Sequence, residues 1–371
     1  MNSFGYRSDE SCLFPTRAWG LYPLRTEFNR GWRRRFGGAT LTRRMVEHTH
    51  SHDVGADMDG RTRHYGDFYG ISGLEAAPRT PVDDRPLLLV WGNCQAEAMR
   101  ILLSSDAAMP FRTVRIPPVH ELESADLPHV DRLVRQTSVL LTQPVREGYR
   151  HLPLGVPDLT RSLPPHAVVL RWPVLRYAAL HPFQVIVRHP SDPAAVPDLV
   201  PYHDLRTIVA FERGVRPGEN WDLPVSDAGF RDAAQASLDE LRRRESRDTD
   251  IAASDLFQSA GSRATHTINH PTNVVLTALA QRILDHLDTA CTVGDPGREL
   301  LGGVRAPVER RVLRALGLPG EARPDWTVDG SDVSSDVVHR AHLDWYAAHP
   351  QFVDAALARH SELLRILQTT P

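Results

Sequence analysis

The sequence contains no lysine, because all 43 of its basic residues are arginine. A Schiff base with a lysine is therefore excluded, and with it ordinary pyridoxal-phosphate enzymes and lysine aldolases. The same absence excludes a Walker A lysine, a kinase-type phosphate lysine and a Ser-Lys hydrolase. Any anionic ligand must instead be held by arginine, by histidine or by backbone N–H groups.

Cysteines and long apolar runs are also scarce. The three cysteines, Cys12, Cys94 and Cys291, are too few for a disulfide framework. No apolar run approaches the roughly 18 residues that a membrane span needs. The N-terminus lacks the apolar core of a signal peptide. We therefore expect a cytoplasmic protein without a membrane span.

Length and composition predict a globular protein with a distinct N-terminal segment. The 371 residues are 41% hydrophobic and 24% charged, which fits one large domain or two ordinary ones. Up to Arg44, nine arginines face only three carboxylates, and we expect residues 1–57 to form a disordered basic extension. A nucleic-acid-binding arm is the alternative. Because the net charge of the whole chain is -3, the remainder is acidic, which argues against nucleic acid as the main partner.

Residues 58–225 alternate short apolar runs with helical patterns. The pattern predicts strands at residues 87–91, 111–116, 138–141 and 167–170, and helices at 96–103 and 127–135. Strands that alternate with helices indicate an α/β fold, with a small parallel sheet and flanking helices. This segment is the predicted α/β core.

Residues 226–371 show a different, mainly helical pattern. Amphipathic helices are predicted at residues 230–245, 271–287, 306–316, 337–348 and 350–367. We expect this second part to pack on the α/β core. Hydrophobic repeats with a period of 20–50 residues, which would indicate a solenoid, are not visible.

The first candidate site is Gly92-Asn93-Cys94-Gln95, which joins the first predicted strand to a helix. In open parallel sheets, ligands bind at this carboxyl end of the strands. A helix N-terminus offers unpaired N–H groups and makes a thiol more reactive. Cys94 is therefore a candidate nucleophile or a polar wall of an active site, and a buried structural cysteine is the alternative. Asn93 and Gln95 could donate to a developing oxyanion.

Two further strand ends should lie on the same rim. Thr142-Gln143-Pro144 could place Gln143 near a substrate carbonyl, with Arg146 and Arg150 near phosphate. A plain loop is the alternative.

Arg171-Trp172-Pro173 is followed by Arg176, Tyr177 and His181. This set of cations, aromatic rings and an imidazole could hold an adenine ring and phosphates. An aromatic-rich structural loop is equally consistent with the pattern.

The fourth candidate site is Asn269-His270-Pro271, at the head of a predicted helix. His270 is a candidate general base, with an expected pKa near the working pH. Pro271 suits a first helical turn, and Asn269 or His270 lies near the expected cap. Helix capping by Asn269 alone is the alternative.

Several common site motifs are missing. The sequence has no GxGxxG, no GxSxG and no Cys/His spacing typical of zinc. His48, His50 and His52 alternate in the N-terminal segment, but no predicted helix or strand would hold them in a fixed arrangement. We therefore expect no functional metal.

Taken together, the four sites resemble the WcbI-type capsular polysaccharide biosynthesis family. The resemblance rests on the Gly92–Gln95 turn, Leu141–Pro144 with Tyr149-Arg150, Trp172–Pro182, and Asn269–Asn273, in this order within residues 87–287. It implies a coenzyme A-binding protein that acetylates a sugar hydroxyl, with an α/β N-terminal part and a helical C-terminal part. It also implies an active-site set of Asn93, Cys94, Gln95, Gln143, Asn269 and His270.

From this resemblance we expect acyl transfer from acetyl-coenzyme A, with His270 as base and with Asn93 and Gln143 at the oxyanion. Cys94 is either acylated or only shapes the pocket. Residues expected to contact the coenzyme are Gly92, Gln95, Arg150, Arg171, Trp172, Arg176, Tyr177 and His181. The acceptor is a saccharide or a small natural product, and the oligomeric state is left open.

Two other functions fit the same residues. An esterase or thioesterase would use Cys94 and His270 as a hydrolytic pair. A non-catalytic protein would only bind coenzyme A or a nucleotide. Turnover with and without an acceptor distinguishes these functions from acyl transfer.

Overall fold

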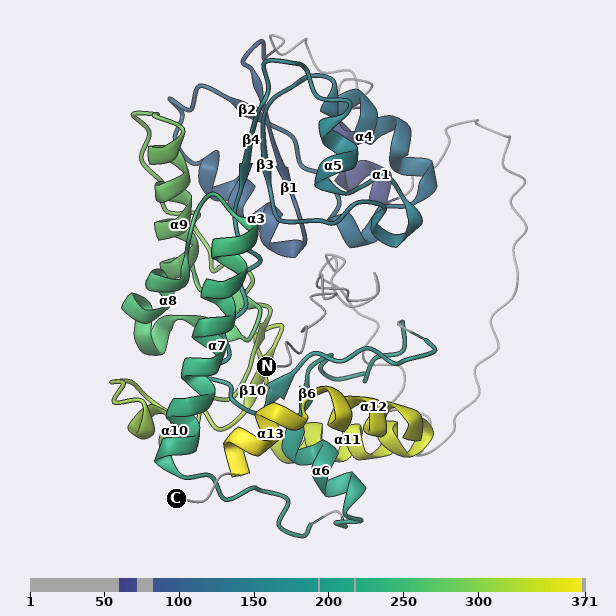
Figure 1. The fold of residues 1–371 in the computed structure, drawn as a ribbon, viewed down its shortest axis with the longest axis vertical. Coiled ribbons are helices and arrows are strands. Elements are labelled where there is room, and N and C mark those ends of the chain that lie inside the picture. The colour runs from purple at the N-terminus through teal and green to yellow at the C-terminus, as the bar shows by residue number, and fades with distance from the viewer. Residues whose placement is uncertain (1–59, 72–82, 193, 217, 369–371) are drawn as a thin grey trace, which may run out of the picture.

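A computed structural model describes residues 60–71, 83–192, 194–216 and 218–368 (Figure 1). The predicted extension at residues 1–57, with its three alternating histidines, lies outside the described residues. The predicted division at residue 225 likewise stays a prediction.

A parallel sheet of four strands forms the core of the N-terminal half, in the order β2-β1-β3-β4. Strand β1, one of the two inner strands, is buried along its whole length, because both faces of the sheet are covered. The predicted α/β class with a small parallel sheet is confirmed. The strands are β1 Leu87–Trp91, β2 Arg112–Thr113, β3 Thr137–Thr142 and β4 Val168–Arg171.

The side chains of β1 alternate between two hydrophobic clusters, one on each face of the sheet. Leu88 and Val90 pack with α3 Cys94–Leu103 and α9 Asn273–His286. Leu87, Leu89 and Trp91 pack with the other layer, which contains α4 Leu127–Val134 and α5 Val156–Thr160. Figure 1 shows these two helical layers on opposite sides of the sheet. Helix α9 lies late in the chain but completes the cover of the early sheet.

The rest of the chain is mainly helical, as the sequence predicted. A 22-residue helix, α7, runs from the lower helices to the sheet (Figure 1). Besides α3, α4, α5 and α9, the helices are α1 Gly60–His64, α2 Gly66–Tyr69, α6 Leu205–Glu212, α7 Asp227–Asp248, α8 Ser254–Ala260, α10 Arg310–Ala315, α11 Ser335–Ala348, α12 Pro350–Arg359 and α13 Ser361–Gln368. Short antiparallel pairs are β5 Gln184–Val185 with β6 His203–Asp204, β7 Thr265–Thr267 with β8 His270–Pro271, and β10 Trp326–Val328 with both β9 Val304–Arg305 and β11 Ser331–Val333.

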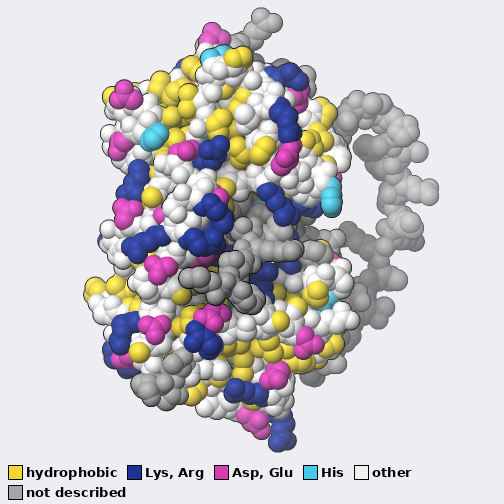
Figure 2. Space-filling model, viewed as in Figure 1, with side chains coloured by type: hydrophobic (Ala, Val, Ile, Leu, Met, Phe, Trp, Pro, Cys, Tyr) yellow, Lys and Arg dark blue, Asp and Glu magenta, His cyan; other side chains and the backbone are white. Residues whose placement is uncertain are grey.

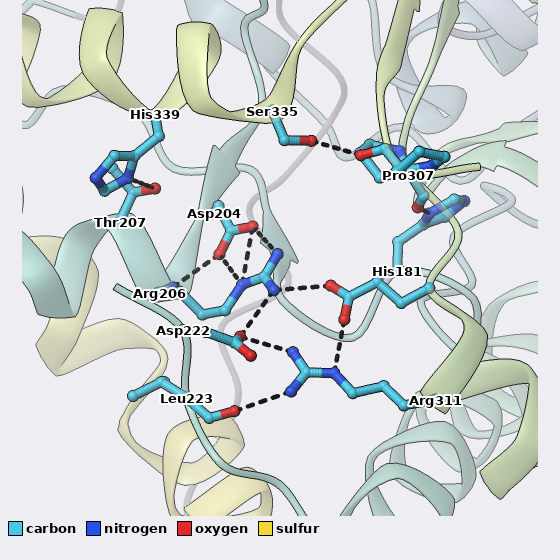
Figure 3. Close-up of polar contacts among 12 residues, drawn as sticks. His181, Asp204, Arg206, Thr207, Asp222, Leu223, Pro307, Arg311, Ser335 and His339 are labelled. Carbon is cyan, nitrogen blue, oxygen red and sulfur yellow. Dashed lines mark hydrogen bonds and ion pairs between the residues drawn. The ribbon is translucent and has the colours of Figure 1, made fainter. Parts of the chain in front are cut away.

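A partly exposed ion-pair network joins the lower helices (Figure 3). Arg206 in α6 lies 2.7 Å from Asp204 and Glu309 and 3.0 Å from Asp222. Arg311 in α10 contacts Asp222 and Glu309. The nearby carboxylates raise the pKa of Arg206 above its usual value, despite burial, so the cation is retained. The network connects α6, α10 and the loop before α7.

Several predicted elements differ from the observed ones, and the predicted helix at 306–316, for example, begins only at Arg310. The predicted strand at 111–116 is only a two-residue edge strand, and it pairs with β1 alone. The predicted helix at 271–287 begins at Asn273, because His270 and Pro271 pair with β7. The predicted helix at 350–367 is two helices, which separate at His360.

None of the helices in the described part of the chain has both the length and the apolar character that crossing a bilayer requires.

The buried histidines predict acid-sensitive stability. Burial lowers the pKa of His120 and His270 to about 3, and that of His181 and His342 to about 4. These rings stay neutral in the folded state, whereas the unfolded chain binds protons below about pH 6.5. Their contribution to the free energy of unfolding is fully present above pH 6.5. It should fall toward pH 4 by about 1.4 kcal/mol per pH unit for each such histidine. Urea unfolding at pH 7.5, 6.5 and 5.5 tests this, and equal free energies at all three would contradict it.

Candidate active site

The first two predicted sites meet where the strand order of the sheet reverses. The chain runs from β1 outward to β2 and then returns to the other side of β1 as β3. Ligands of open α/β sheets bind at this point, outside the carboxyl ends of the strands. Gly92, Asn93 and Cys94 follow β1, and Gln143 follows β3. The topology therefore explains why residues 50 positions apart in the chain share one site.

A cysteine and a histidine face each other at this edge. Cys94 is the first residue of α3, and its Sγ lies 3.7 Å from Nε2 of His270 in β8. Cys94 is half-buried, whereas Cys291 is buried in the core. The fourth predicted site thus joins the first, across 176 positions of the chain. A thiol and an imidazole at this distance can exchange a proton.

The expected pKa of His270 is wrong. We predicted a value near the working pH, but burial lowers its pKa to about 3. The nearby His266 lowers it further, while a hydrogen bond with the backbone of Leu301 acts in the opposite direction. His270 is therefore neutral at physiological pH and can accept a proton.

Two glutamine side chains build a buried polar frame around the turn. Gln143 accepts from the Asn93 N–H at 2.9 Å and donates to Oε1 of Gln95 at 2.8 Å. Gln95 also donates to the carbonyls of Leu175 and Asn269, both at 2.7 Å. The Asn93 side chain caps α3 by accepting from the Gln95 N–H. These bonds fix the orientation of both glutamines and tie three predicted sites together.

The segment that carries His270 is held by a second buried network. The Tyr202 hydroxyl donates to Oδ1 of Asn269 at 2.8 Å. The Thr267 hydroxyl lies 3.0 Å from the Tyr202 hydroxyl and 3.1 Å from the same Asn269 oxygen. We expected Asn269 or His270 near the helix cap and Pro271 in the first turn. Instead Thr272 is the N-cap residue, and Asn269 stabilises the strand pair before the helix.

A large cavity opens beside this centre, between the sheet edge and the lower helices. Its volume is about 1480 Å³, which exceeds the roughly 300–1,000 Å³ of ordinary ligand pockets. Asn93 and Gln143 line it at the sheet edge, and Ile268 lines it two residues before His270. Cys94 and His270 are not among the lining residues, but Cys94 follows Asn93 directly and His270 lies two residues after Ile268. The cavity has room for a large coenzyme and a second molecule.

Arginines concentrate along one part of the cavity wall. They extend from the sheet edge to the lower helices, and Figure 2 shows arginine side chains gathered across the middle of this face. Some of them have carboxylate partners: Arg171 meets Asp250 at 3.8 Å, and Arg247 meets Asp248 at 2.5 Å. The arginines in the lining are Arg146, Arg161, Arg171, Arg176, Arg244, Arg247 and Arg359.

Arg176 and Arg244 form the most unusual pair in this wall. Burial and the positive charge of Arg176 lower the pKa of Arg244 to about 10. The carboxylate of Glu240 lies 3.5 Å from Nε of Arg244, a loose contact that only partly offsets the charge. Two neighbouring guanidinium groups of this kind would be stabilised by an anion between them.

Comparison with known families decides the identity of the chain. The family model described as "Polysaccharide biosynthesis enzyme WcbI" matches residues 87–292, more than half of the chain. The chain belongs to the WcbI family. It is therefore a member of a family of polysaccharide biosynthesis enzymes, and the predicted resemblance is confirmed.

A solved structure of WcbI shares the fold. It matches with a TM-score of 0.66 at 19% sequence identity, over 77% of this chain and 99% of that one. That structure is described as a novel polysaccharide biosynthesis enzyme, in its native form without a disulfide bond between coenzyme A and a cysteine. Comparison with curated proteins finds no match.

Four of the residues that we expected to contact the coenzyme are not among the residues that line the cavity. Trp172 is fully buried in the core beside the sheet, and the ring of Tyr177 lies 5.0 Å from that of Phe257. His181 is buried and bonded through Nδ1 to the carbonyl of Pro307 (Figure 3). Arg150 bonds to the carbonyl of His120. Trp172, Tyr177 and His181 follow β4 and pack inside the protein, whereas Arg150 precedes β4 and is exposed. We do not assign these four side chains to the coenzyme.

Gly92 and Gln95 lie at the site, but their contribution is to position the hydrogen-bonded side chain of Gln143. Gln95 is fully buried with its amide engaged, and Gly92 leaves space for Gln143. Among the predicted coenzyme residues, Arg171 and Arg176 line the cavity.

Two residues of this WcbI-family site were missed by the sequence reasoning. Arg244 belongs to the run Arg242–Arg244, which is typical of a solvated helix face. Tyr202 precedes a two-residue strand and follows no motif. The helical period could have found Arg244, since it shares a face of α7 with Ala233, Ser237 and Glu240. Within the described ranges, no group of three or more His, Cys, Asp or Glu side chains is arranged to hold a metal ion.

Gly92→Ala should damage the site. A Cβ at this position would lie 2.4 Å from Oε1 of Gln143, so Gln143 would have to leave its bonds to Asn93 and Gln95. We expect a loss of about 1–3 kcal/mol in the free energy of unfolding, together with loss of ligand binding. Urea unfolding and coenzyme A titration measure both effects. Gly60→Ala is the matched control, because nothing lies within 4 Å of its added Cβ. Equal behaviour of the two variants would contradict the role of the frame.

Proposed function

We propose that the protein is a coenzyme A-dependent acyltransferase that transfers an acyl group, such as acetyl, to a saccharide hydroxyl. The observation that carries this proposal is the Cys94–His270 pair, whose neighbours Asn93 and Ile268 line a large cavity that also contains arginines. Membership of the WcbI family supports a role in polysaccharide biosynthesis. The naming of coenzyme A together with a cysteine in the related solved structure supports this coenzyme.

The phosphates of coenzyme A would be held by Arg176 and Arg244. These two cations share the cavity wall, and burial together with the positive charge of Arg176 lowers the pKa of Arg244. A bound anion would offset both effects. Arg171 lines the same wall but is already near Asp250. The absence of lysine leaves arginine as the cationic side chain for phosphate.

The reaction centre would be Cys94 with His270. In the direct route, the acceptor oxygen attacks the thioester carbonyl and its proton passes to Nε2 of His270. The tetrahedral intermediate then expels the coenzyme A thiolate, which takes the proton back. In the covalent route, the Cys94 sulfur attacks first and its proton passes by way of His270 to the departing coenzyme A thiolate. The acceptor then attacks the acyl-cysteine and restores the thiol.

Stabilisation of the oxyanion is assigned to Asn93 and Gln143. Both line the cavity next to Cys94. Gln143 is oriented by its two buried bonds, which leave one N–H of Nε2 for a ligand. A well-placed donor contributes about 3–4 kcal/mol to transition-state stabilisation. Asn269 and Gln95 are assigned to positioning.

We place this activity in the cytoplasm, where coenzyme A thioesters are substrates for soluble enzymes. The partner is a saccharide acceptor, and nucleic acid is not part of the proposal.

Release of free coenzyme A thiol tests the proposal. With acetyl-coenzyme A, thiol should appear only when a saccharide acceptor is added, and the acceptor should gain one acetyl group by mass. Equal release without acceptor would replace the proposal with a thioesterase. Binding of coenzyme A without any release, across a panel of hexoses and uronic acids, would instead indicate a non-catalytic protein.

A further inference from the structure

One face of α7 lines the cavity and changes character along its length. Ala233, Ala236 and Ser237 occupy the N-terminal part of this face, followed by Glu240 and then Arg244. At about 1.5 Å per residue, Ala233 and Arg244 are about 16 Å apart along the helix. Helix α7 begins at the lower helices and ends near the sheet (Figure 1), so Arg244 lies toward the sheet and Ala233 toward the lower helices. We call these the charged end and the apolar end of the cavity.

The apolar end is enclosed by aliphatic side chains from three segments. Val185 comes from β5, and Leu363 and Ile366 come from α13; they pack in the same cluster as Ala233. Ile186 follows Val185 and also lines the cavity. The side chains that share a cluster with Ala233 offer a common apolar surface that can contact a flexible hydrocarbon.

The apolar wall begins at the reaction centre. Ile268 lies two residues before His270 and shares a hydrophobic cluster with Ile186. The Ile268 N–H donates to Gln184 at 2.9 Å, which fixes β5 beside the segment that carries His270. Ile268 thus connects the segment that carries His270 to the aliphatic side chains that line the cavity.

The chemistry of this wall does not suit the saccharide acceptor. Sugar hydroxyls need hydrogen-bond partners, and burying them without partners is costly. The polar residues that line this end are Arg359, His360 and Glu362 at the junction of α12 and α13, with Gln184 and Ser237. The oxygens of Gln184 and Ser237 already accept from the N–H groups of Ile268 and Ala178. Glu362 already forms an ion pair with Arg365 at 2.5 Å. Methylene groups, in contrast, gain from contact with aliphatic side chains.

We infer that the apolar end of the cavity holds the acyl chain of a medium-chain acyl-coenzyme A, longer than acetyl. This inference rests on the proposed function, since it extends the same coenzyme site beyond the thioester. The charged end then takes the phosphates and the apolar end takes the chain. The acyl donor is thus a medium-chain thioester.

Thioether analogues of coenzyme A test this without turnover. S-ethyl, S-butyl, S-hexyl and S-octyl coenzyme A would be titrated against the full chain by calorimetry, beside coenzyme A itself. Each buried methylene should tighten binding about threefold to fourfold, up to the length that fills the cavity. Equal dissociation constants along the series, with coenzyme A bound, would overturn the inference and leave the proposed function intact. No binding of coenzyme A at all would overturn both.

A variant locates the effect at the proposed end. Ala236 is exposed on α7 and lines the cavity, so Ala236→Phe should fold and fill the space for the chain. The gain from S-ethyl to S-octyl coenzyme A should then shrink at least tenfold. Gln235→Phe is the matched control, because Gln235 is exposed on the same helix and bonds only locally to Asp239. The control should keep the full gain, and an unchanged gain in both variants would overturn the placement of the chain.

Discussion

Replacing His270 with alanine is expected to lower kcat/KM for acyl transfer by about 10²- to 10⁴-fold, the usual contribution of a general base. The ring is neutral because burial lowers its pKa to about 3, and its Nε2 lies 3.7 Å from the Cys94 sulfur. No other imidazole makes this contact among the described residues. Thiol release with acceptor present measures the loss.

Binding must be measured on the same variant. Coenzyme A should still bind His270→Ala within about threefold, because the arginines that hold the phosphates are unchanged. His270→Ala that retains near wild-type turnover would contradict the role of base. Loss of coenzyme A binding together with activity would point to a structural role instead.

Cys94→Ser separates the two routes. The covalent route predicts a loss comparable to that of His270→Ala, and an acyl adduct on the wild-type protein by intact mass. The direct route predicts near wild-type activity and no adduct. Since Asn93 caps α3 through its own side chain, the substitution should leave the helix start in place.

Replacing Arg244 with methionine is the second large expected effect. It should raise KM for acetyl-coenzyme A by about tenfold to 100-fold, since charge-assisted bonds to phosphate contribute about 1.5–3 kcal/mol each. The kcat should change little, because Arg244 is not placed at the reacting carbon. Unfolding of the ligand-free protein should not become easier, since the variant removes a cation that lies beside Arg176.

Two controls make this prediction specific. Arg243→Met removes an equal charge from the same helix, but Arg243 is exposed and paired with Glu240 at 2.8 Å, so KM should stay within about twofold. Acetyl-pantetheine lacks the nucleotide phosphates, and its KM should be insensitive to Arg244→Met. Equal losses with both substrates would contradict an anion site at Arg176 and Arg244.

Local patterns in the sequence were enough to predict the sheet and the turn after its first strand. The run at residues 87–91 is β1, and the following Gly92–Gln95 turn opens α3 at the carboxyl edge, because strand ends and helix starts are set by nearby residues. The small sheet β9–β11 was not predicted, since strands of two or three residues carry no periodic signal. Helix α9 was predicted, but its place on the sheet depends on long-range packing.

The same distinction applies within the site. Residue types at four strand and helix ends pointed to Cys94, Gln143 and His270. The pKa of His270 could not be predicted, because burial depends on the whole fold. Trp172 and His181 looked like ligands but are packed inside, and Arg244 looked solvated but faces the cavity. The sequence gives the type of each side chain, but it does not show whether that side chain is buried or faces the cavity.

Reaction with the symmetric disulfide of coenzyme A tests the central claim most directly, that coenzyme A binds in this cavity with its sulfur at Cys94. The Cys94 thiolate would attack one sulfur and release one coenzyme A thiol, leaving a mixed disulfide that peptide mapping can locate. We predict modification at Cys94, at least tenfold faster than with pantethine, the same disulfide without nucleotide phosphates. Modification elsewhere in the chain, or equal rates with the two disulfides, would contradict the account.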